Sequence, residues 1–104
     1  MPRFDVFRNA SKQTREDLPY LLDVQADLLA DLATRVVVPL AKRAVVRSPL
    51  TRLNPVFTVE NRQMIMLTTE IAGVPVAVLG EKVGSLAPHA SEIIGAIDFL
   101  LTGA

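Results

Sequence analysis

The chain has 104 residues, half of them hydrophobic, and its 11 basic and 11 acidic side chains give a formal net charge of zero. This length predicts one domain spanning residues 1–104. The balanced charge argues against direct nucleic-acid binding by the chain alone, because phosphate contacts normally require an excess of bases. The absence of cysteine and the single histidine exclude disulfides, thiolate sites and histidine-rich metal sites, and we expect no metal and no cofactor.

The sequence also predicts a protein that has no membrane contact. Its notable apolar stretch, residues 71–80, is far shorter than the ~20 residues that a helix needs to span a bilayer. Charged residues such as Arg3, Asp5 and Arg8 interrupt the N-terminal segment, which therefore does not resemble a secretory signal. We expect a cytoplasmic protein.

The first third of the chain predicts two strands around a polar loop. Residues 3–7 and residues 20–26 alternate between polar and apolar side chains, which is typical of half-buried strands. Residues 9–19 are mostly polar and predict a long exposed loop, a kind of segment that is often functional. Residues 27–34 fit either a short helix with Asp27 as its N-cap or a wide turn between strands.

The middle of the chain predicts further strands. Consecutive valines in residues 35–40 favour a buried strand, and Pro39 is expected to place its end at an edge or bulge. Residues 41–53 predict a loop with at most one helical turn. Residues 55–60 and 63–69 predict a hairpin whose turn lies at residues 60–62.

The last third predicts one strand and one helix. Residues 74–79 form the expected strand, broken by Pro75, and Gly80 and Gly84 are expected to flank a connection. Pro88 suits the first position of a helix that continues to about Leu101. Many short strands followed by a terminal helix predict an α+β fold, mainly β, with an antiparallel sheet or small barrel and a C-terminal helix.

The terminal helix carries more apolar side chains than one packed face can bury. Ile93, Ile97 and Leu100 recur at helical spacing, which predicts the docked face. Phe99, Leu100 and Leu101 are consecutive, so they cover most of the helix circumference. Two compatible explanations stay open: a second chain or a loop covers the surplus, or the tip protrudes and docks into a partner.

The titratable residues do not predict an active site. His89 is the only histidine, and its place in the first turn of the helix predicts an exposed side chain without a structural role. Asp23, Asp27 and Asp31 recur every four residues, but Asp23 falls inside a predicted strand, so we interpret the spacing as accidental. We expect a binding protein and not an enzyme.

Basic residues are concentrated in one part of the chain. No acid lies between Asp31 and Glu60, and that interval holds Arg35, Lys42, Arg43, Arg47 and Arg52. These bases are consistent with solvated loops and faces, or with a basic band that receives an acidic partner segment.

Taken in order along the chain, several segments resemble the CcdB family, the toxins of plasmid-type toxin–antitoxin pairs. The resemblance covers essentially the whole sequence, and the order and spacing of its pieces make it specific. The segments are Phe4-Asp5-Val6-Phe7, the run from Leu22 to Leu29, Arg35 to Leu40, Leu53-Asn54-Pro55-Val56, Met66-Leu67-Thr68-Thr69, Val74 to Gly80, and the end of the chain from Ile93 to Ala104.

The resemblance implies a fold, an activity and two partners. The fold would be a small antiparallel barrel of SH3-like, Greek-key character with a C-terminal helix, assembled as a homodimer. The two C-terminal tips would enter the cleft between the A subunits of DNA gyrase and trap the enzyme on cleaved DNA. A partly disordered, CcdA-like antitoxin would wrap the toxin and release gyrase.

The resemblance also assigns site residues, position by position. The gyrase-binding residues implied are Leu28, Leu29, Asp98, Leu101, Thr102, Gly103 and Ala104. The exposure and length of the 9–19 loop and the positive charge of its surroundings, rather than the resemblance, give the expected antitoxin-binding residues, which are Arg8, Lys12, Gln13 and Arg15. The basic stretch from Arg35 to Arg52 is expected at or near the same antitoxin site.

The sequence departs from the family pattern at the tip. The plasmid toxin of the family ends in Trp-Gly-Ile, whereas this chain ends in Thr102-Gly103-Ala104, and an asparagine of the family is Asp98 here. Loss of an aromatic anchor weakens most interfaces. Two alternatives therefore stay open: a relative that binds antitoxin but no longer poisons gyrase, and an endoribonuclease toxin of the MazF type, which would need acid–base residues gathered on one sheet face.

Overall fold

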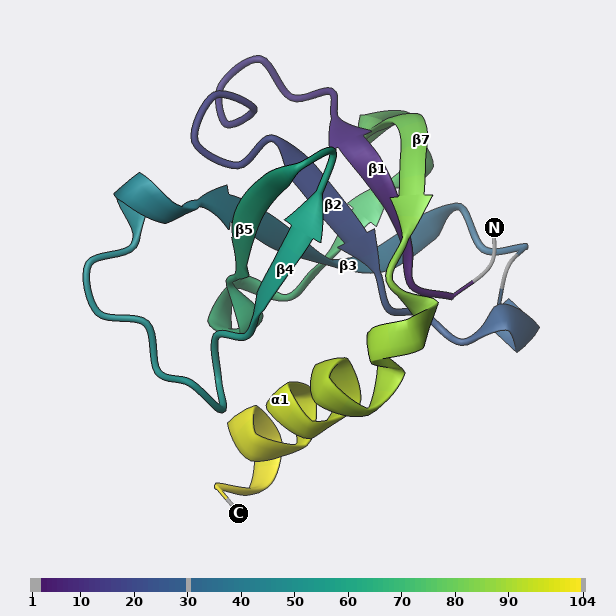
Figure 1. Ribbon diagram of the computed structural model, residues 1–104. Coiled ribbons are helices and arrows are strands. Elements are labelled where there is room, and N and C mark those ends of the chain that lie inside the picture. The colour runs from purple at the N-terminus through teal and green to yellow at the C-terminus, as the bar shows by residue number, and fades with distance from the viewer. Residues whose placement is uncertain (1–2, 30, 104) are drawn as a thin grey trace.

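The computed structural model describes residues 3–29 and 31–103, and its main feature is a curled antiparallel sheet with one helix at the C-terminal end (Figure 1). This confirms the expected mainly β, α+β fold. Among the described residues, no helix is long and apolar enough to cross a membrane. The elements are β1 (Asp5–Asn9), β2 (Tyr20–Asp23), β3 (Thr34–Lys42), β4 (Val56–Val59), β5 (Arg62–Met66), β6 (Ala72–Pro75), β7 (Leu79–Ser85) and α1 (Ala90–Thr102).

Strand β3 organises the sheet. The strand order is β4-β5-β3-β2-β1-β7, and β6 pairs with β3 beside β5. One edge of β3 pairs with β2, while the other pairs first with β6 and then, from Leu40 onward, with β5. Pro39 lies between those two partners, so the expected strand end at Pro39 is wrong. Proline has no N–H to donate, and it is tolerated there because this edge of β3 passes from pairing with β6 to pairing with β5 at that point.

The β4–β5 hairpin draws the sheet into its curl, and its turn lies at Glu60-Asn61, so the predicted turn is confirmed except that Arg62 already belongs to β5. Glu60 and Asn61 have φ angles of 50° and 63°, as a two-residue hairpin turn requires. The Glu60 carboxylate accepts hydrogen bonds from the Tyr20 hydroxyl at 2.6 Å and the Arg8 guanidinium at 2.9 Å. These contacts tie the hairpin tip to β1 and β2, beside which it lies in Figure 1.

The predictions for residues 74–84 are wrong in their bounds. Residues 74–79 are not one strand, because β6 stops at Pro75 and a 3₁₀ turn over Val76–Val78 precedes β7. Gly80 and Gly84 lie within β7 and do not flank a connection. A Cβ at Gly80 would lie 2.9 Å from the Arg8 carbonyl oxygen, so glycine here allows β7, which carries bulges opposite β1, to approach β1 closely.

The N-terminal strands also differ from expectation. β1 begins at Asp5, because Phe4 has a φ of 72° and lies outside the strand. Asp5 is buried by β7, where its carboxylate meets the Lys82 ammonium at 3.3 Å. β2 ends at Asp23, and only a single 3₁₀ turn, η1 (Asp27–Leu29), follows. The wide turn is therefore confirmed, and the helix over 27–34 is wrong.

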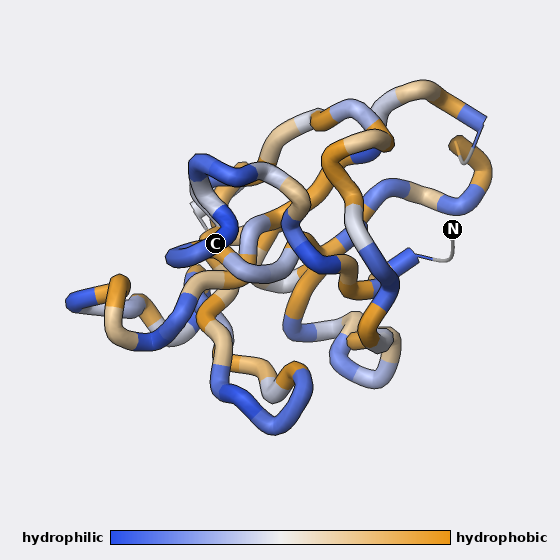
Figure 2. The backbone as a smooth tube through the Cα atoms, turned by 90° about the horizontal axis from the view of Figure 1, so that it is seen from above, coloured by the Kyte–Doolittle hydropathy of each residue, from blue (hydrophilic) through white to orange (hydrophobic). Residues whose placement is uncertain are grey.

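The sheet buries apolar side chains on both faces. On one face a core cluster packs against α1 through Ile93 and Ala96, and the burial of a large side chain such as Ile93 contributes roughly 1.5–3 kcal/mol. On the other face, Leu21 and Val37 line a hollow of ≈ 280 Å³ together with Leu18 of the 9–19 loop. Figure 2 shows hydrophobic stretches through the middle of the molecule and hydrophilic stretches in several of the outlying turns of the chain.

Candidate functional site

The C-terminal tip projects from a docked helix. Ile93 is fully buried, whereas Leu101 is 75% exposed and Asp98, Thr102 and Gly103 are also exposed. Of the three consecutive apolar residues, Phe99 and Leu100 are half-buried and only Leu101 is presented to solvent. The tip thus carries the surplus apolar side chain that helical spacing predicted. Ala104, also predicted here, lies outside the described residues.

Local hydrogen bonds give the tip a defined end. Gly103 adopts the left-handed conformation, with a φ of 72°, and its N–H donates to the Phe99 carbonyl at 2.8 Å. The Thr102 hydroxyl donates to the Asp98 carbonyl at 2.8 Å. The Arg52 guanidinium lies 4.5 Å from the centre of the Phe99 ring. The last turn of α1 is therefore capped, and Arg52 of the connection between β3 and β4 contacts it.

The η1 turn presents a second apolar feature, the η1 leucines Leu28 and Leu29. Leu28 is 97% exposed and Leu29 is 49% exposed. The Arg3 backbone N–H donates to the Asp27 carboxylate at 2.7 Å, which ties η1 to the N-terminal end of the chain. This turn displays its leucines without the support of a regular helix.

The two apolar features lie apart in one copy of the chain. Figure 1 places η1 beside the N-terminus and the tip of α1 at the opposite end of the molecule, and the two termini are also separated in Figure 2. The predicted gyrase-binding residues therefore form two surfaces per chain. The sequence pattern alone contained no signal of this separation, because it depends on the curl of the sheet.

The 9–19 loop is exposed as predicted but is locally ordered. Lys12, Gln13 and Arg15 are all exposed. The Asn9 side chain donates to the Thr14 hydroxyl and to the Leu18 carbonyl, each at 2.9 Å. The backbone N–H groups of Arg15 and Leu18 donate four residues back, so the loop contains helical turns. The three predicted antitoxin residues of this loop therefore lie on a surface whose conformation is fixed by hydrogen bonds.

Arg8 differs from those three residues because carboxylates already compensate its charge. Its guanidinium donates to Glu81 at 3.1 Å and to Glu60 at 2.9 Å. The hydrogen bond to Glu81 and the charge of Glu60 raise the pKa of Arg8 above its usual value. Arg8 still borders a hollow of ≈ 330 Å³ that Arg15 also lines, but it offers less free charge than Lys12 or Arg15.

The predicted basic stretch is only partly a surface feature. Arg35 is fully buried and cannot contact a partner, which corrects its inclusion in that stretch. The stretch does meet the 9–19 loop, because the Lys42 N–H donates to the Asp17 carbonyl at 3.1 Å. Asp17 and Glu70 line the adjoining hollow, so this junction is less basic than the sequence suggested.

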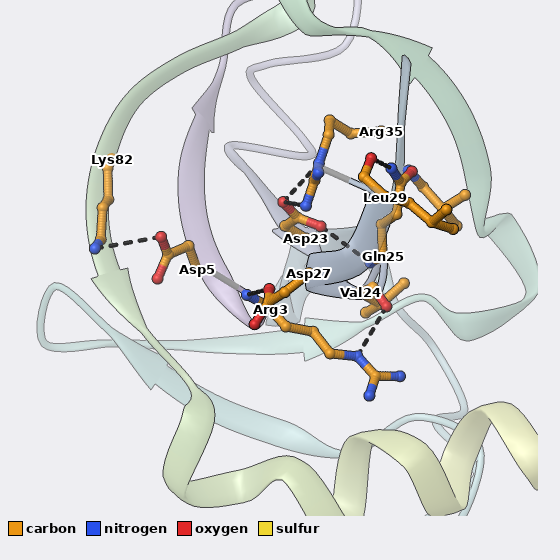
Figure 3. A network of polar contacts seen from close by, with 10 residues as sticks. Arg3, Asp5, Asp23, Val24, Gln25, Asp27, Leu29, Arg35 and Lys82 are labelled. Atoms are coloured by element: carbon orange, nitrogen blue, oxygen red, sulfur yellow. Dashed lines mark hydrogen bonds and ion pairs between the residues drawn. The ribbon is translucent and has the colours of Figure 1, made fainter. Parts of the chain in front are cut away.

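A buried ion pair is the feature that sequence reasoning missed. The Asp23 carboxylate accepts hydrogen bonds from Arg35 at 2.9 and 2.6 Å, and both side chains are fully buried (Figure 3). The alternation of β2 placed Asp23 on the same side as Leu21, and a buried acid requires a partner. A buried position for Asp23 would predict a basic partner, but only the pairing of β2 with β3 identifies that partner as Arg35.

Comparison with known families assigns the chain. A family model described as CcdB protein matches residues 3–103, which is nearly the whole sequence. The chain belongs to the CcdB family. This is a family of toxins from toxin–antitoxin pairs, so the tip, the η1 leucines and the 9–19 loop are the features of a toxin-family protein.

A solved structure shares the fold of this CcdB-family chain. It is named as an endoribonuclease from a mycobacterial species, and it matches with a TM-score of 0.70 over 97% of this chain and 90% of that one. The sequence identity is 19%. At this identity the likeness shows a common fold and nothing about chemistry.

Several titratable groups of this CcdB-family chain are engaged in structural contacts. Within residues 3–29 and 31–103, no group of three or more potential ligands is placed to hold a metal ion. Burial, followed by the hydrogen bond to Glu60, raises the pKa of Tyr20. His89 is exposed, but its ring packs on Phe57 at 5.2 Å between centroids, so the expectation that it has no structural role is wrong.

Proposed function

We propose that this protein is a toxin that binds the A subunit of DNA gyrase and traps the enzyme on cleaved DNA. The observation that carries the proposal is the projecting tip of α1 in a chain of the CcdB family, with Leu101 75% exposed in the capped last turn. An apolar side chain held at the end of a rigid helix binds a cleft with little loss of conformational freedom.

The proposal includes a homodimer. Each chain presents one tip, and two tips related by a two-fold axis would match a symmetric cleft between two gyrase subunits. The η1 leucines lie far from the tip of their own chain, so any single surface containing both would draw them from two copies. Sedimentation at micromolar concentration should show a dimer, and a monomer there would contradict this part of the proposal.

The proposal also includes a CcdA-like antitoxin at the 9–19 loop. Lys12, Gln13 and Arg15 support it, because all are exposed and two carry positive charge on an ordered surface. Arg8 belongs at the margin of this site, since Glu60 and Glu81 compensate its charge. An acidic, disordered segment would be attracted there and would order on binding.

Purified gyrase and the purified toxin provide the test of the proposed function. The expected result is inhibition of supercoiling together with accumulation of cleaved DNA, reversed by the antitoxin. Normal supercoiling with retained antitoxin binding would identify a relative that has lost gyrase poisoning, as the missing tryptophan at Thr102 allows. Cleavage of RNA by the purified toxin would instead support an endoribonuclease.

A further inference from the structure

Gln25 occupies the point where β2 leaves the sheet. The β2–β3 ladder ends with Asp23 opposite Val37, and the Val24 N–H makes one further backbone bond to Val36 at 3.0 Å. Beyond it the chain turns away into η1 (Figure 3). Where backbone pairing with β3 ends, the side chain of Gln25, a residue that is 6% exposed, makes the next hydrogen bond to β3.

The amide of Gln25 bonds in both directions. Its Oε1 accepts the Val36 backbone N–H at 2.9 Å, and its Nε2 donates to the Leu29 carbonyl at 2.7 Å. One side chain therefore connects β3 to the last residue of η1. A carboxamide is suited to this because it offers a donor and an acceptor at the same end, whereas a carboxylate accepts only.

Contacts on both sides of Gln25 fix its position. Its backbone N–H donates to Asp23 Oδ1 at 3.0 Å, and the other oxygen of Asp23 holds the buried Arg35. Arg3 lies on the outer side, where its Nε donates to the Val24 carbonyl at 3.1 Å and its backbone N–H to Asp27. The turn is thus held from the sheet and from the N-terminal segment.

These contacts keep an apolar side chain exposed to solvent, which is energetically unfavourable. A leucine that is 97% exposed gives up the burial that stabilises leucine elsewhere, and a single 3₁₀ turn has little stability of its own. We propose that Gln25 is a positioning residue for gyrase binding, which holds the η1 turn so that Leu28 and Leu29 contact the target. This inference rests on the proposed function.

The test combines hydrogen exchange with a double-mutant cycle in the full-length protein. Gln25→Met keeps the side-chain length and removes both bonds, and Gln63→Met, at an exposed glutamine of β5, is the matched control. Gln25→Met should weaken gyrase binding about tenfold in the native background and by less than about twofold when Leu28 and Leu29 are both alanine. Antitoxin binding and the amides of β3 other than Val36 should be unaffected, while the Val36 amide, which loses its acceptor, and amides 26–29 exchange faster.

Several results would overturn the inference. They are equal gyrase binding by Gln25→Met and the native protein, an equal loss in both backgrounds, or unchanged exchange at amides 26–29. If Gln25→Met does not fold, Gln25→Asn replaces it, because that side chain stays neutral and polar but is one methylene too short to bond Val36 and Leu29 together. If the native protein does not bind gyrase, the proposed function fails, and the exchange measurement alone decides whether Gln25 holds the turn.

Discussion

The tip of α1 and the η1 turn both display leucine to solvent, but different forces hold them. The tip continues a helix whose backbone bonds are internal and whose inner face is docked through Ile93 and Ala96. The η1 turn has one 3₁₀ turn, and it depends on side chains, with Gln25 on the inside and Arg3 on the outside. The conformation of the α1 tip should therefore tolerate single substitutions nearby. The conformation of the η1 turn should not, because a few side-chain hydrogen bonds maintain it.

The largest expected effect comes from the ion pair behind η1. Arg35→Met leaves the Asp23 carboxylate buried without its partner, which should lower the free energy of unfolding by about 3–5 kcal/mol. Denaturant unfolding measures this loss. The double variant Asp23→Leu/Arg35→Met should recover most of it, because an apolar pair leaves no buried charge. No recovery would mean that the pair has a further role in the fold.

The second effect tests the docking of the tip. Ile93→Ala removes a fully buried side chain between α1 and the sheet, and it should cost about 2–5 kcal/mol of stability. Ile94→Ala is the matched control on the next position of the same helix, where 36% of the residue is exposed, and it should cost much less. Similar losses in both variants would show that α1 is docked differently.

A third region, the β4–β5 hairpin, is also held by side chains and predicts a pH dependence. Burial and the bond to Glu60 raise the pKa of Tyr20 above the usual value of about 10, so the fold favours the neutral phenol. That stability is fully present below pH 10 and is lost as pH rises through the raised pKa. Tyr20→Phe should cost about 1.5 kcal/mol at neutral pH and should flatten the loss above pH 10. An unchanged alkaline profile would exclude Tyr20 as its source.

The smallest effect on stability should come from the 9–19 loop. Lys12→Glu/Arg15→Glu changes two exposed charges, so stability should change by less than about 0.5 kcal/mol. Association with an acidic antitoxin should nevertheless become slower and less dependent on salt. Stopped-flow binding at several salt concentrations measures this, and the neutral variant Lys12→Gln/Arg15→Gln should lie between. Unchanged rates would move the antitoxin site elsewhere.

Local patterns in the sequence predicted the parts of the fold that local chemistry determines. The spacing of Ile93 and its neighbours predicted α1, and Glu60-Asn61 predicted the hairpin turn. The exposure of an apolar side chain at the tip was predicted because one packed face of a helix cannot bury three consecutive apolar residues. The same reasoning gave the exposure of the 9–19 loop, because its residues are polar over a long interval.

The remaining features depend on contacts between segments far apart in the chain. The buried pair joins Asp23 to Arg35 through strand pairing, and Pro39 is tolerated inside β3 because its edge changes partner there. Gly80 is required by the approach of β7 to Arg8, which no local pattern contains. The separation of η1 from the tip likewise arises from the curl of the sheet, so the sequence grouped residues that one chain keeps apart.

The most direct test of the account is deletion of residues 101–104, which includes the exposed Leu101, measured by supercoiling with purified gyrase. The deletion removes the exposed end of α1 and its cap, and it leaves the docked residues Ile93 and Ala96 in place. Stability should fall by only about 1 kcal/mol, the contribution of a terminal hydrogen bond, and antitoxin binding should persist. The account predicts that inhibition of gyrase disappears in this variant; inhibition equal to that of the full-length protein would contradict the assignment of the tip as the gyrase contact.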